Sequence, residues 1–432
     1  MDHMMASALV VLGSTLFLLG TGMWVSLTLL AVGMITLGVL SPAPMGSLVA
    51  STLWDASWGW ALTSLPLFIW MGEILFRTNL ASAMFTGLAP WLGRLPGGLL
   101  HVNILGCGTL AAVTGSSAVT CATIGRLSVP ELQARGYPEK MTIGSLAGSG
   151  TLGLLIPPSI IMIVYGVTAD VSIARLFVAG IFPGIVLGAL FSGYIALWAL
   201  LNKQRIPVPD QLLGWRDKIH ESRHLIPVVV LIGAVLGSIY TGIATATEAA
   251  AIGVVGSLAV SAVQGSLNWA TFRESLLGAT RLYCMIALIL AGAAFLTLSM
   301  GYIGLPRHLA EFVGSLGLSP FMLMVALALF YILLGCFLDG ISMVVLTMGV
   351  ILPTVQAAGF DLVWFGIFLV VVVEMAQITP PVGFNLFVLQ GMTGKEITWI
   401  SRVTFPFFLL MCLMVLLLWF VPGIATWLPS KM

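Results

Sequence analysis

Long apolar runs separated by short polar segments dominate the pattern along this chain. In the N-terminal half the runs cover residues 6–40, 58–76, 97–128, 142–168 and 173–200. Runs of this length can cross a hydrocarbon core of about 30 Å as helices. Two runs are interrupted, the first by Gly20–Gly22 and the third by Thr114–Ala118 ("TGSSA"). We read residues 6–40 as two short spans and residues 97–128 as a re-entrant helical hairpin.

Two apolar runs, one in each half of the chain, contain consecutive prolines. They are Pro157-Pro158 in "GLLIPPS" and Pro380-Pro381 in "AQITPPVGFN". Proline has no amide hydrogen, and its ring clashes with the preceding helical turn. In lipid every backbone group needs a partner within the protein, so freed carbonyls are tolerated only where they line a cavity or bind something. Each double proline therefore predicts a break in a spanning helix, at a place where the freed carbonyls line a cavity or bind a ligand.

The two halves of the chain match each other at an offset of 223 residues without gaps. Four of the five prolines between residues 101 and 200 fall on prolines; the matching pairs are Pro130 with Pro353, Pro157 with Pro380, Pro158 with Pro381 and Pro183 with Pro406. Such self-similarity at a fixed spacing indicates an internal repeat. We divide the chain into a first repeat (residues 1–200), a charged linker (201–224) and a second repeat (225–432).

Each repeat is predicted to contain about five spans, a re-entrant hairpin and a broken helix. The segments are scaffold helices (6–94), a hairpin (97–128) and a broken helix (142–168) in the first repeat, with counterparts at 225–300, 320–352 and 362–391 in the second. An odd number of crossings inverts the second repeat relative to the first. The fold class is therefore an all-α polytopic membrane protein of two inverted repeats.

Lysine and arginine placement agrees with this topology. One side receives Arg77, Arg94, Arg126, Arg135, Lys140, Lys203, Arg205, Arg216, Lys218, Arg223, Arg273, Arg281, Lys395 and Arg402, whereas the other receives only Arg175, Arg307 and Lys431. Cytoplasmic loops carry the excess of positive charge. We therefore expect both termini on the outer side of a cytoplasmic membrane.

Composition narrows the possible functions. Hydrophobic residues make up 59% and charged residues 8% of the chain, against about 25% charged in soluble domains. The lipid bilayer is thus a partner, and a formal net charge of +1 gives no reason to expect nucleic-acid binding. The five cysteines are scattered singly without a CxxC pair, so we interpret them as small apolar residues.

Oxygen-bearing side chains gather near the predicted tips and breaks. They are Ser116, Ser117, Thr120, Thr151 and Ser159 in the first repeat, and Asp339, Ser342, Gln377, Thr379 and Asn385 in the second. Carbonyl and hydroxyl oxygens suit a hard cation such as Na⁺, and the N-terminus of the half-helix after each break suits an anionic group. A charge at a membrane hairpin tip makes Asp339 a functional candidate. Glu374 is either a proton site or a structural partner.

Four segments resemble the large membrane subunit of tripartite ATP-independent periplasmic (TRAP) transporters. They are "GRLPGGLLHVNILGCGTLAAVTGSSAVTCATIG", "SGTLGLLIPPSIIMIVYGVTADVSIARLFVAGIFPG", "GCFLDGISMVVLTMGVILPT" and "ITPPVGFNLFVLQGMTG". The resemblance implies an elevator-type transporter in a bacterial inner membrane that imports a small organic acid with Na⁺. Dicarboxylates, sialic acids and ectoines are carried in the family. It also implies a periplasmic substrate-binding protein and a small four-helix membrane subunit, expected as a separate polypeptide.

The resemblance also implies where ligands bind. The Na⁺ sites would involve Gly115, Ser116, Ser117, Gly153, Leu154 and Pro157, and their counterparts Asp339, Gly340, Ala376, Gln377 and Thr379. Substrate would lie between the two tips, near Ser117, Thr120, Pro158, Ser159, Ser342, Pro381 and Asn385.

Other functions stay open at this point. A carrier that needs no binding protein, or one coupled to protons, is the main alternative. An intramembrane enzyme would need a Ser–His or paired-Asp arrangement at depth. His101 is the only histidine near a hairpin, and Ser116 stands where a second aspartate would face Asp339, so we do not expect an enzyme. A passive channel would fail to concentrate its substrate.

Overall fold

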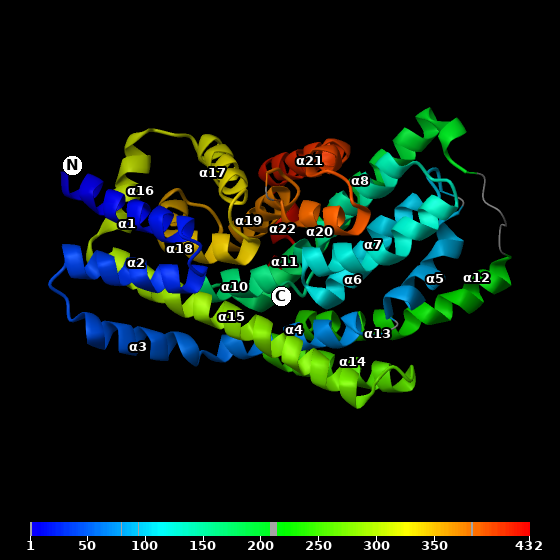
Figure 1. Ribbon diagram of the computed structural model, residues 1–432, viewed down its shortest axis with the longest axis horizontal. Helices are drawn as coiled ribbons and strands as arrows, with labels where there is room; N and C mark the ends of the chain where they lie inside the picture. Colours follow the sequence, from blue (N-terminus) through cyan, green and yellow to red (C-terminus); the bar gives the residue numbers. More distant parts are fainter. Residues whose placement is uncertain (1, 79, 94, 208–213, 382) are drawn as a thin grey trace.

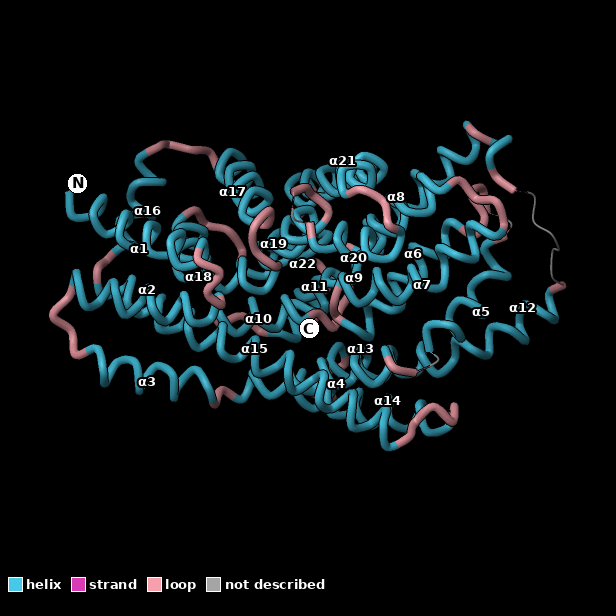
Figure 2. Tube along the Cα trace, viewed as in Figure 1, coloured by secondary structure: helices cyan, strands magenta, loops and turns pink. Residues whose placement is uncertain are grey.

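The two double-proline segments interrupt helices at the centre of the molecule. A computed structural model describes residues 2–78, 80–93, 95–207, 214–381 and 383–432. Arg94 and linker residues 208–213, which the sequence analysis placed on the cytoplasmic side, lie outside the described residues. The described part of the chain is helical and contains no strand (Figure 2).

The helices of the first half and linker are α1 (Asp2–Gly20), α2 (Val25–Leu40), α3 (Met45–Ser57), α4 (Ser64–Phe76), α5 (Leu80–Leu92), α6 (Leu100–Thr114), α7 (Ser117–Ala134), α8 (Glu139–Gly150), α9 (Leu152–Leu155), α10 (Ile160–Thr168), α11 (Ile173–Leu201) and α12 (Trp215–Ser222). Those of the second half are α13 (Ile226–Tyr240), α14 (Ala246–Val263), α15 (Trp269–Tyr302), α16 (Leu305–Ser315), α17 (Pro320–Leu334), α18 (Gly340–Ala357), α19 (Leu362–Gln377), α20 (Phe384–Thr393), α21 (Ile397–Phe420) and α22 (Gly423–Thr426).

The helices that carry the breaks are also the most deeply buried. Every residue of α19 from Trp364 to Gln377 is buried, and so is every residue of α8 from Met141 to Gly150. By contrast, α3 has no buried residue at all. Figure 1 shows α19 and α10 in the middle of the molecule, with α3 at its edge. The first break, at Pro157 and Pro158, is therefore enclosed by protein, whereas Pro380 and Pro381 of the second break are exposed.

Helix boundaries in the two halves follow the same offset as the prolines. Both α7 and α18 have 18 residues, and they begin at Ser117 and Gly340, which are 223 positions apart. The same separation holds for the first residues of α8 and α19, Glu139 and Leu362. The Pro157-Pro158 and Pro380-Pro381 bonds are both cis. These coincidences support the internal repeat.

The two predicted hairpins differ in how tightly their arms pack. In the first, α6 and α7 are in direct contact, and Gly106 of α6 lies against Ile124 of α7. In the second, α17 packs mainly on α19, whereas α18 packs on α10, α15 and α16. A hydrogen bond between the Tyr331 and Thr347 hydroxyls, 2.7 Å long, bridges α17 and α18. The second hairpin is therefore the more open of the two.

The number of long apolar helices establishes a polytopic membrane protein. Within the described residues, six helices are long and apolar enough to span a bilayer, and two bent pairs raise that number to eight. One pair joins residues 139–155 to 160–168 with a bend of 40°, across the first double proline. The other joins α3 to residues 60–76 with a bend of 53°. The apolar pattern predicts the span at 58–76, whereas α3 lies outside the predicted spans.

Basic segments gather at one end of the molecule. Figure 1 shows the α7–α8 connection, α12 and the α14–α15 connection at the right, and the N-terminus with α16 at the left. Lys395 pairs with Glu139 at 3.0 Å, joining the start of α21 to the start of α8. The sidedness of the basic segments in the membrane stays a prediction.

Candidate functional site

The first hairpin tip lies directly against the first break. Gly115 ends α6 with a φ of +60°, and its carbonyl accepts a hydrogen bond from the Ile160 amide at 3.4 Å. A Cβ atom at position 115 would lie 2.7 Å from the Pro158 carbonyl oxygen, and one at position 153 only 2.6 Å from the Ser117 nitrogen. Glycine is required at both positions because the two backbones touch.

A carboxyl group from the second half of the chain completes this contact. Glu374 of α19 is fully buried, and its Oε1 accepts a hydrogen bond from the Leu154 amide at 3.0 Å. The same oxygen also accepts a hydrogen bond from the Ser117 hydroxyl. Glu374 therefore holds the hairpin tip and the broken helix of the first half together. Of the two roles left open for Glu374, the structural partner is the one these contacts describe.

Buried polar atoms without partners lie in the same region. Among the described residues, Glu374 Oε2 has no hydrogen-bond partner, and neither Oδ1 nor Nδ2 of Asn385 has one. A Cβ at Gly150 would lie 3.5 Å from Asn385 Nδ2 and 3.0 Å from Cys121 Cβ. Asn385 thus faces the interface of α7 and α8. Cys121 and Gly150 at this interface are four positions along the chain from Ser117 and Leu154. Buried polar atoms are normally paired, so orphaned ones are places where an ion or water belongs.

The second tip is built around an aspartate that caps its own helix. Asp339 precedes α18, and its Oδ2 accepts hydrogen bonds from the amides of Ile341 at 3.1 Å and Ser342 at 3.2 Å. Its Oδ1 accepts a hydrogen bond from the Ser342 hydroxyl. Asp339 is exposed. The carboxylate is therefore placed by the helix N-terminus, with solvent access on its outer side.

The second tip also lies against the second break. A Cβ at Gly335 would lie 2.3 Å from Ala376 Cβ, and the Cys336 thiol donates to the Pro380 carbonyl at 3.4 Å. A Cβ at Gly340 would lie 3.3 Å from Gln377 Nε2 and 2.8 Å from Ile161 Cδ1. Because Ile161 belongs to α10, the second tip touches the first broken helix, just as Glu374 reaches the first tip.

The remaining predicted residues bond locally. Thr120 exchanges a hydrogen bond with Thr114 at 2.8 Å, Ser159 caps α10 by accepting from the Met162 amide at 3.4 Å, and Thr379 donates to the Met375 carbonyl at 2.7 Å. A hydroxyl that donates to its own helix keeps lone pairs for a cation. With the carbonyls that lose their amide partners to proline, these oxygens fit Na⁺ in ligand type.

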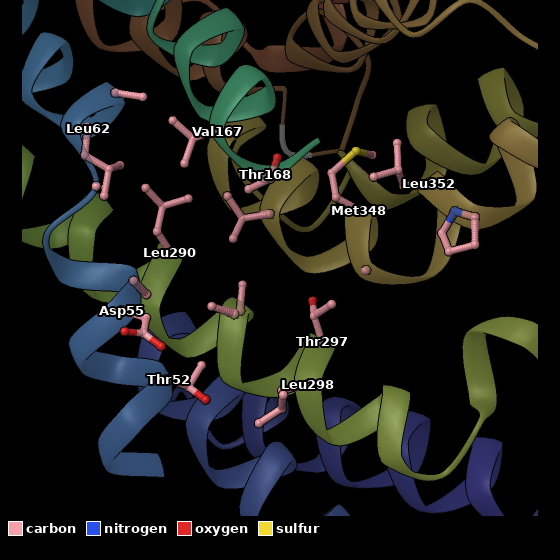
Figure 3. Close-up of a pocket in the computed structure, with 18 residues that line it drawn as sticks. Thr52, Asp55, Leu62, Val167, Thr168, Leu290, Thr297, Leu298, Met348 and Leu352 are labelled. Carbon is pink, nitrogen blue, oxygen red and sulfur yellow. The ribbon is translucent and has the colours of Figure 1, made fainter. Parts of the chain in front are cut away.

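A crevice separates these segments from the outer helices. Its volume is about 570 Å³, and its walls come from α3, α10, α15 and α18 (Figure 3). Leu290, Thr297 and Leu298 line one side, and Met348 and Leu352 line the other. None of the predicted ligand-binding residues lines it. Asp55 of α3 also lines it, but most of the lining is apolar, so the crevice is a boundary between the two groups of helices rather than the predicted substrate position.

Broken helices and seated hairpin tips in a polytopic helical membrane protein are the plan of secondary transporters. Comparison with known proteins gives the particular family. Residues 12–424 match the family described as tripartite ATP-independent periplasmic transporter, DctM component. The chain belongs to this family and is a TRAP large permease.

Relatives extend over nearly the whole chain. The C4-dicarboxylate TRAP transporter large permease protein DctM of Rhodobacter capsulatus is 30% identical over 98% of this chain and 99% of its own length. The Pseudomonas aeruginosa protein of the same name is 29% identical over 92% of both chains. The isethionate TRAP transporter permease protein DctMQ of Oleidesulfovibrio alaskensis is 31% identical, over 84% of this chain and 57% of its own.

Among solved structures, the YdaH transporter of Alcanivorax borkumensis superposes with a TM-score of 0.66. The match covers 95% of this chain and 99% of YdaH at 14% identity, so it shows a shared fold.

Sequence reasoning found the tips and the breaks but missed what joins them. The sequence marked Glu374, six residues before Pro380, as either a proton site or a structural partner, but it did not identify the residues that Glu374 contacts. Its partners lie 257 and 220 positions away, at Ser117 and Leu154. A lone acidic residue in the apolar stretch "VVVVEMAQ" was the available signal, because a buried charge requires partners.

We predict that Glu374→Ala lowers the free energy of unfolding by about 3 kcal/mol or more, because it leaves a buried amide and hydroxyl unpaired and opens a cavity. Glu374→Gln should cost less than half as much, since its amide oxygen can still accept both bonds. Thermal unfolding of the detergent-solubilised protein measures both. Ser117→Ala combined with Glu374→Ala should cost less than the sum of the two. Equal losses for the Ala and Gln variants would contradict this role.

Proposed function

We propose that this permease imports a small organic acid together with Na⁺ by an elevator movement. The observation that carries the proposal is the seating of each hairpin tip on a proline break, at Gly115–Pro158 and Gly335–Ala376. Each contact brings oxygen ligands to an interrupted backbone, which suits a cation at membrane depth. One Na⁺ site would use Gly115, Ser116, Ser117, Gly153, Leu154 and Pro157. The other would use Asp339, Gly340, Ala376, Gln377 and Thr379.

Substrate is proposed to bind between the two tips. The residues assigned to it are Ser117, Thr120, Pro158, Ser159, Ser342, Pro381 and Asn385. Pairing of the acid with bound Na⁺ would couple the two movements. Relatives are named for C4-dicarboxylates, isethionate, and ectoine and 5-hydroxyectoine, which makes succinate, isethionate and ectoine the first acids to assay. Sialic acids belong in the same screen.

The elevator movement would take place along the apolar crevice. The hairpins and broken helices would move against a scaffold of the helices within 6–94 and 225–300. At the crevice α18 approaches α15 closely, because a Cβ at Gly349 would lie 3.1 Å from Thr297 Cβ. The mostly apolar lining of the crevice favours sliding, because few polar contacts are lost when the surfaces move.

Two partners and an orientation complete the proposal. A periplasmic binding protein would deliver the acid, and a small four-helix membrane subunit would join the scaffold. The permease would lie in a bacterial inner membrane with both termini in the periplasm, because the basic segments belong on the cytoplasmic side.

Proton coupling is the second candidate. It is favoured by the buried Glu374, whose Oε2 has no hydrogen-bond partner and is free to take up a proton. A carrier of this kind that works without a binding protein belongs to the same alternative.

Uptake into proteoliposomes separates these functions. With the small subunit and the binding protein present, an inward Na⁺ gradient should drive accumulation of at least one acid among succinate, isethionate, ectoine and sialic acid. An inward proton gradient with K⁺ should drive none. Uptake that needs only a proton gradient would favour the second candidate. Uptake that never exceeds the external concentration would indicate a channel.

We predict that Asp339→Asn and Thr379→Val weaken Na⁺ binding. Asparagine can still cap α18, so the fold is kept while the charge is lost. In the wild-type protein, Na⁺ at about tenfold excess over its dissociation constant should stabilise the fold by about 1.4 kcal/mol relative to K⁺. Thermal unfolding in Na⁺ and K⁺ at constant ionic strength should show a smaller difference in both variants. Wild-type differences in both would contradict the second site.

We predict that a disulfide between cysteines at positions 349 and 297 stops transport. The 3.1 Å separation of the two Cβ positions is close to the roughly 3.8 Å that a disulfide needs. In a Cys284→Ser background, oxidation of Gly349→Cys/Thr297→Cys should abolish uptake, and reduction should restore it. Thr297→Cys alone provides the control. Full uptake after confirmed cross-linking would contradict an elevator.

A further inference from the structure

A second cavity borders the second break on the side away from the apolar crevice. Its volume is about 360 Å³. One wall is the break itself, with Ile378, Thr379 and Pro380, and the other is the first part of α21, with Ser401, Arg402, Phe405 and Phe408. A guanidinium group therefore lies across a cavity from the interrupted backbone.

This guanidinium has no carboxylate partner among the described residues. The other cation of this region, Lys395, pairs with Glu139 at 3.0 Å, and Arg135 pairs with Glu131 at 2.6 Å. Within ion-pair distance of Arg402 the structure describes no acidic group. An unpaired arginine beside a break in a membrane helix is an available binding group for an anion.

Arg402 has no charged counterpart at the equivalent position in the first half of the chain. At the offset of 223 residues Pro380 corresponds to Pro157, Phe408 to Ile185 and Arg402 to Ala179. The first break also borders a cavity, of about 550 Å³, lined by Ile156, Pro157 and Ile185 among others. That cavity has no charged side chain in its walls. The charge is thus an addition at one break rather than part of the shared architecture.

The two hydroxyls in the cavity already donate to nearby carbonyls, which leaves the guanidinium as the donor without a partner among the described residues. Thr379 donates its proton to the Met375 carbonyl at 2.7 Å, and Ser401 donates to the Thr398 carbonyl at 3.1 Å. In this arrangement each hydroxyl offers the cavity only oxygen lone pairs, which accept hydrogen bonds. A carboxylate or sulfonate accepts hydrogen bonds, so it depends on Arg402, whose planar fork can bond two oxygens at once. The rings of Phe405 and Phe408 offer apolar surface to the carbon chain.

We propose that the acidic group of the transported organic acid binds in this cavity and pairs with Arg402. This assignment rests on the proposed function, because it presumes that an organic acid is the substrate. It adds Arg402, Ser401, Phe405 and Phe408 to the substrate site and places the anionic end of the substrate at the second break. A cation bound at the Asp339 tip and an anion at Arg402 would then flank the same interrupted backbone.

Initial uptake rates of succinate, isethionate, ectoine and sialic acid in the reconstituted tripartite system test the assignment. For whichever acid the wild-type protein accumulates, Arg402→Gln should raise KM about tenfold or more, as expected for the loss of a charge-assisted pair. Arg402→Lys should recover part of that loss because it keeps the charge. Arg281→Gln is the matched control, since Arg281 is also exposed and lies on α15 without an ion pair among the described residues.

The Na⁺-dependent stabilisation of Arg402→Gln should equal that of the wild-type protein, which separates loss of the anion site from damage to the fold. An unchanged KM in Arg402→Gln, or the same change in Arg281→Gln, would overturn the assignment while leaving organic-acid transport intact. If the wild-type protein takes up none of these acids, the proposed function fails, and the assignment fails with it.

Discussion

The constraint on which this structure depends is that a helix interrupted inside a membrane must satisfy its freed backbone groups within the protein. The two double prolines remove amides at the centre of two spans, and the helices that lead into both breaks are enclosed by protein. Residues Trp364–Gln377 and Met141–Gly150 are buried without exception. The tips then approach so closely that only glycine fits at positions 115 and 153. Glycine there follows from the break, because two backbones cannot touch across a Cβ atom.

The same constraint ties the two halves together. Glu374 of the second half bonds the Ser117 hydroxyl and the Leu154 amide of the first. In return, Gly340 of the second tip packs on Ile161 of the first broken helix. Neither site can therefore change its packing without affecting the other. In the proposed symport of an acid with Na⁺, such contacts would provide a physical route by which occupation of one site alters the other.

Local sequence signals predicted those features that depend on neighbouring residues, which are the helix breaks and the hairpin turns. Proline pairs and glycine-containing tips marked the breaks and hairpin turns to within a few residues, because the chemistry of these residue types dictates backbone conformation. Contacts between distant segments were not accessible. Asp339 was recognised as a charge, but its capping of α18 depends on where that helix begins, and the partners of Glu374 lie more than 200 positions away. Helix α3 was missed because it buries no residue.

The two halves differ in the charges near their tips and breaks, and these differences bear more on the proposed function than the shared arrangement does. Each half supplies one tip and one break at the common offset, and chemically equal sites would have equal ligands. Asp339 replaces Ser116, Glu374 replaces Thr151, and Arg402 replaces Ala179 at the common offset. All three charges belong to the second repeat. Glu374 bonds the tip and the broken helix of the first half, and Asp339 and Arg402 border the second tip and break. In the proposed function, a frame of two similar halves with its charges in one half would bind the acid in one orientation, because only one end of the site could pair with an anion.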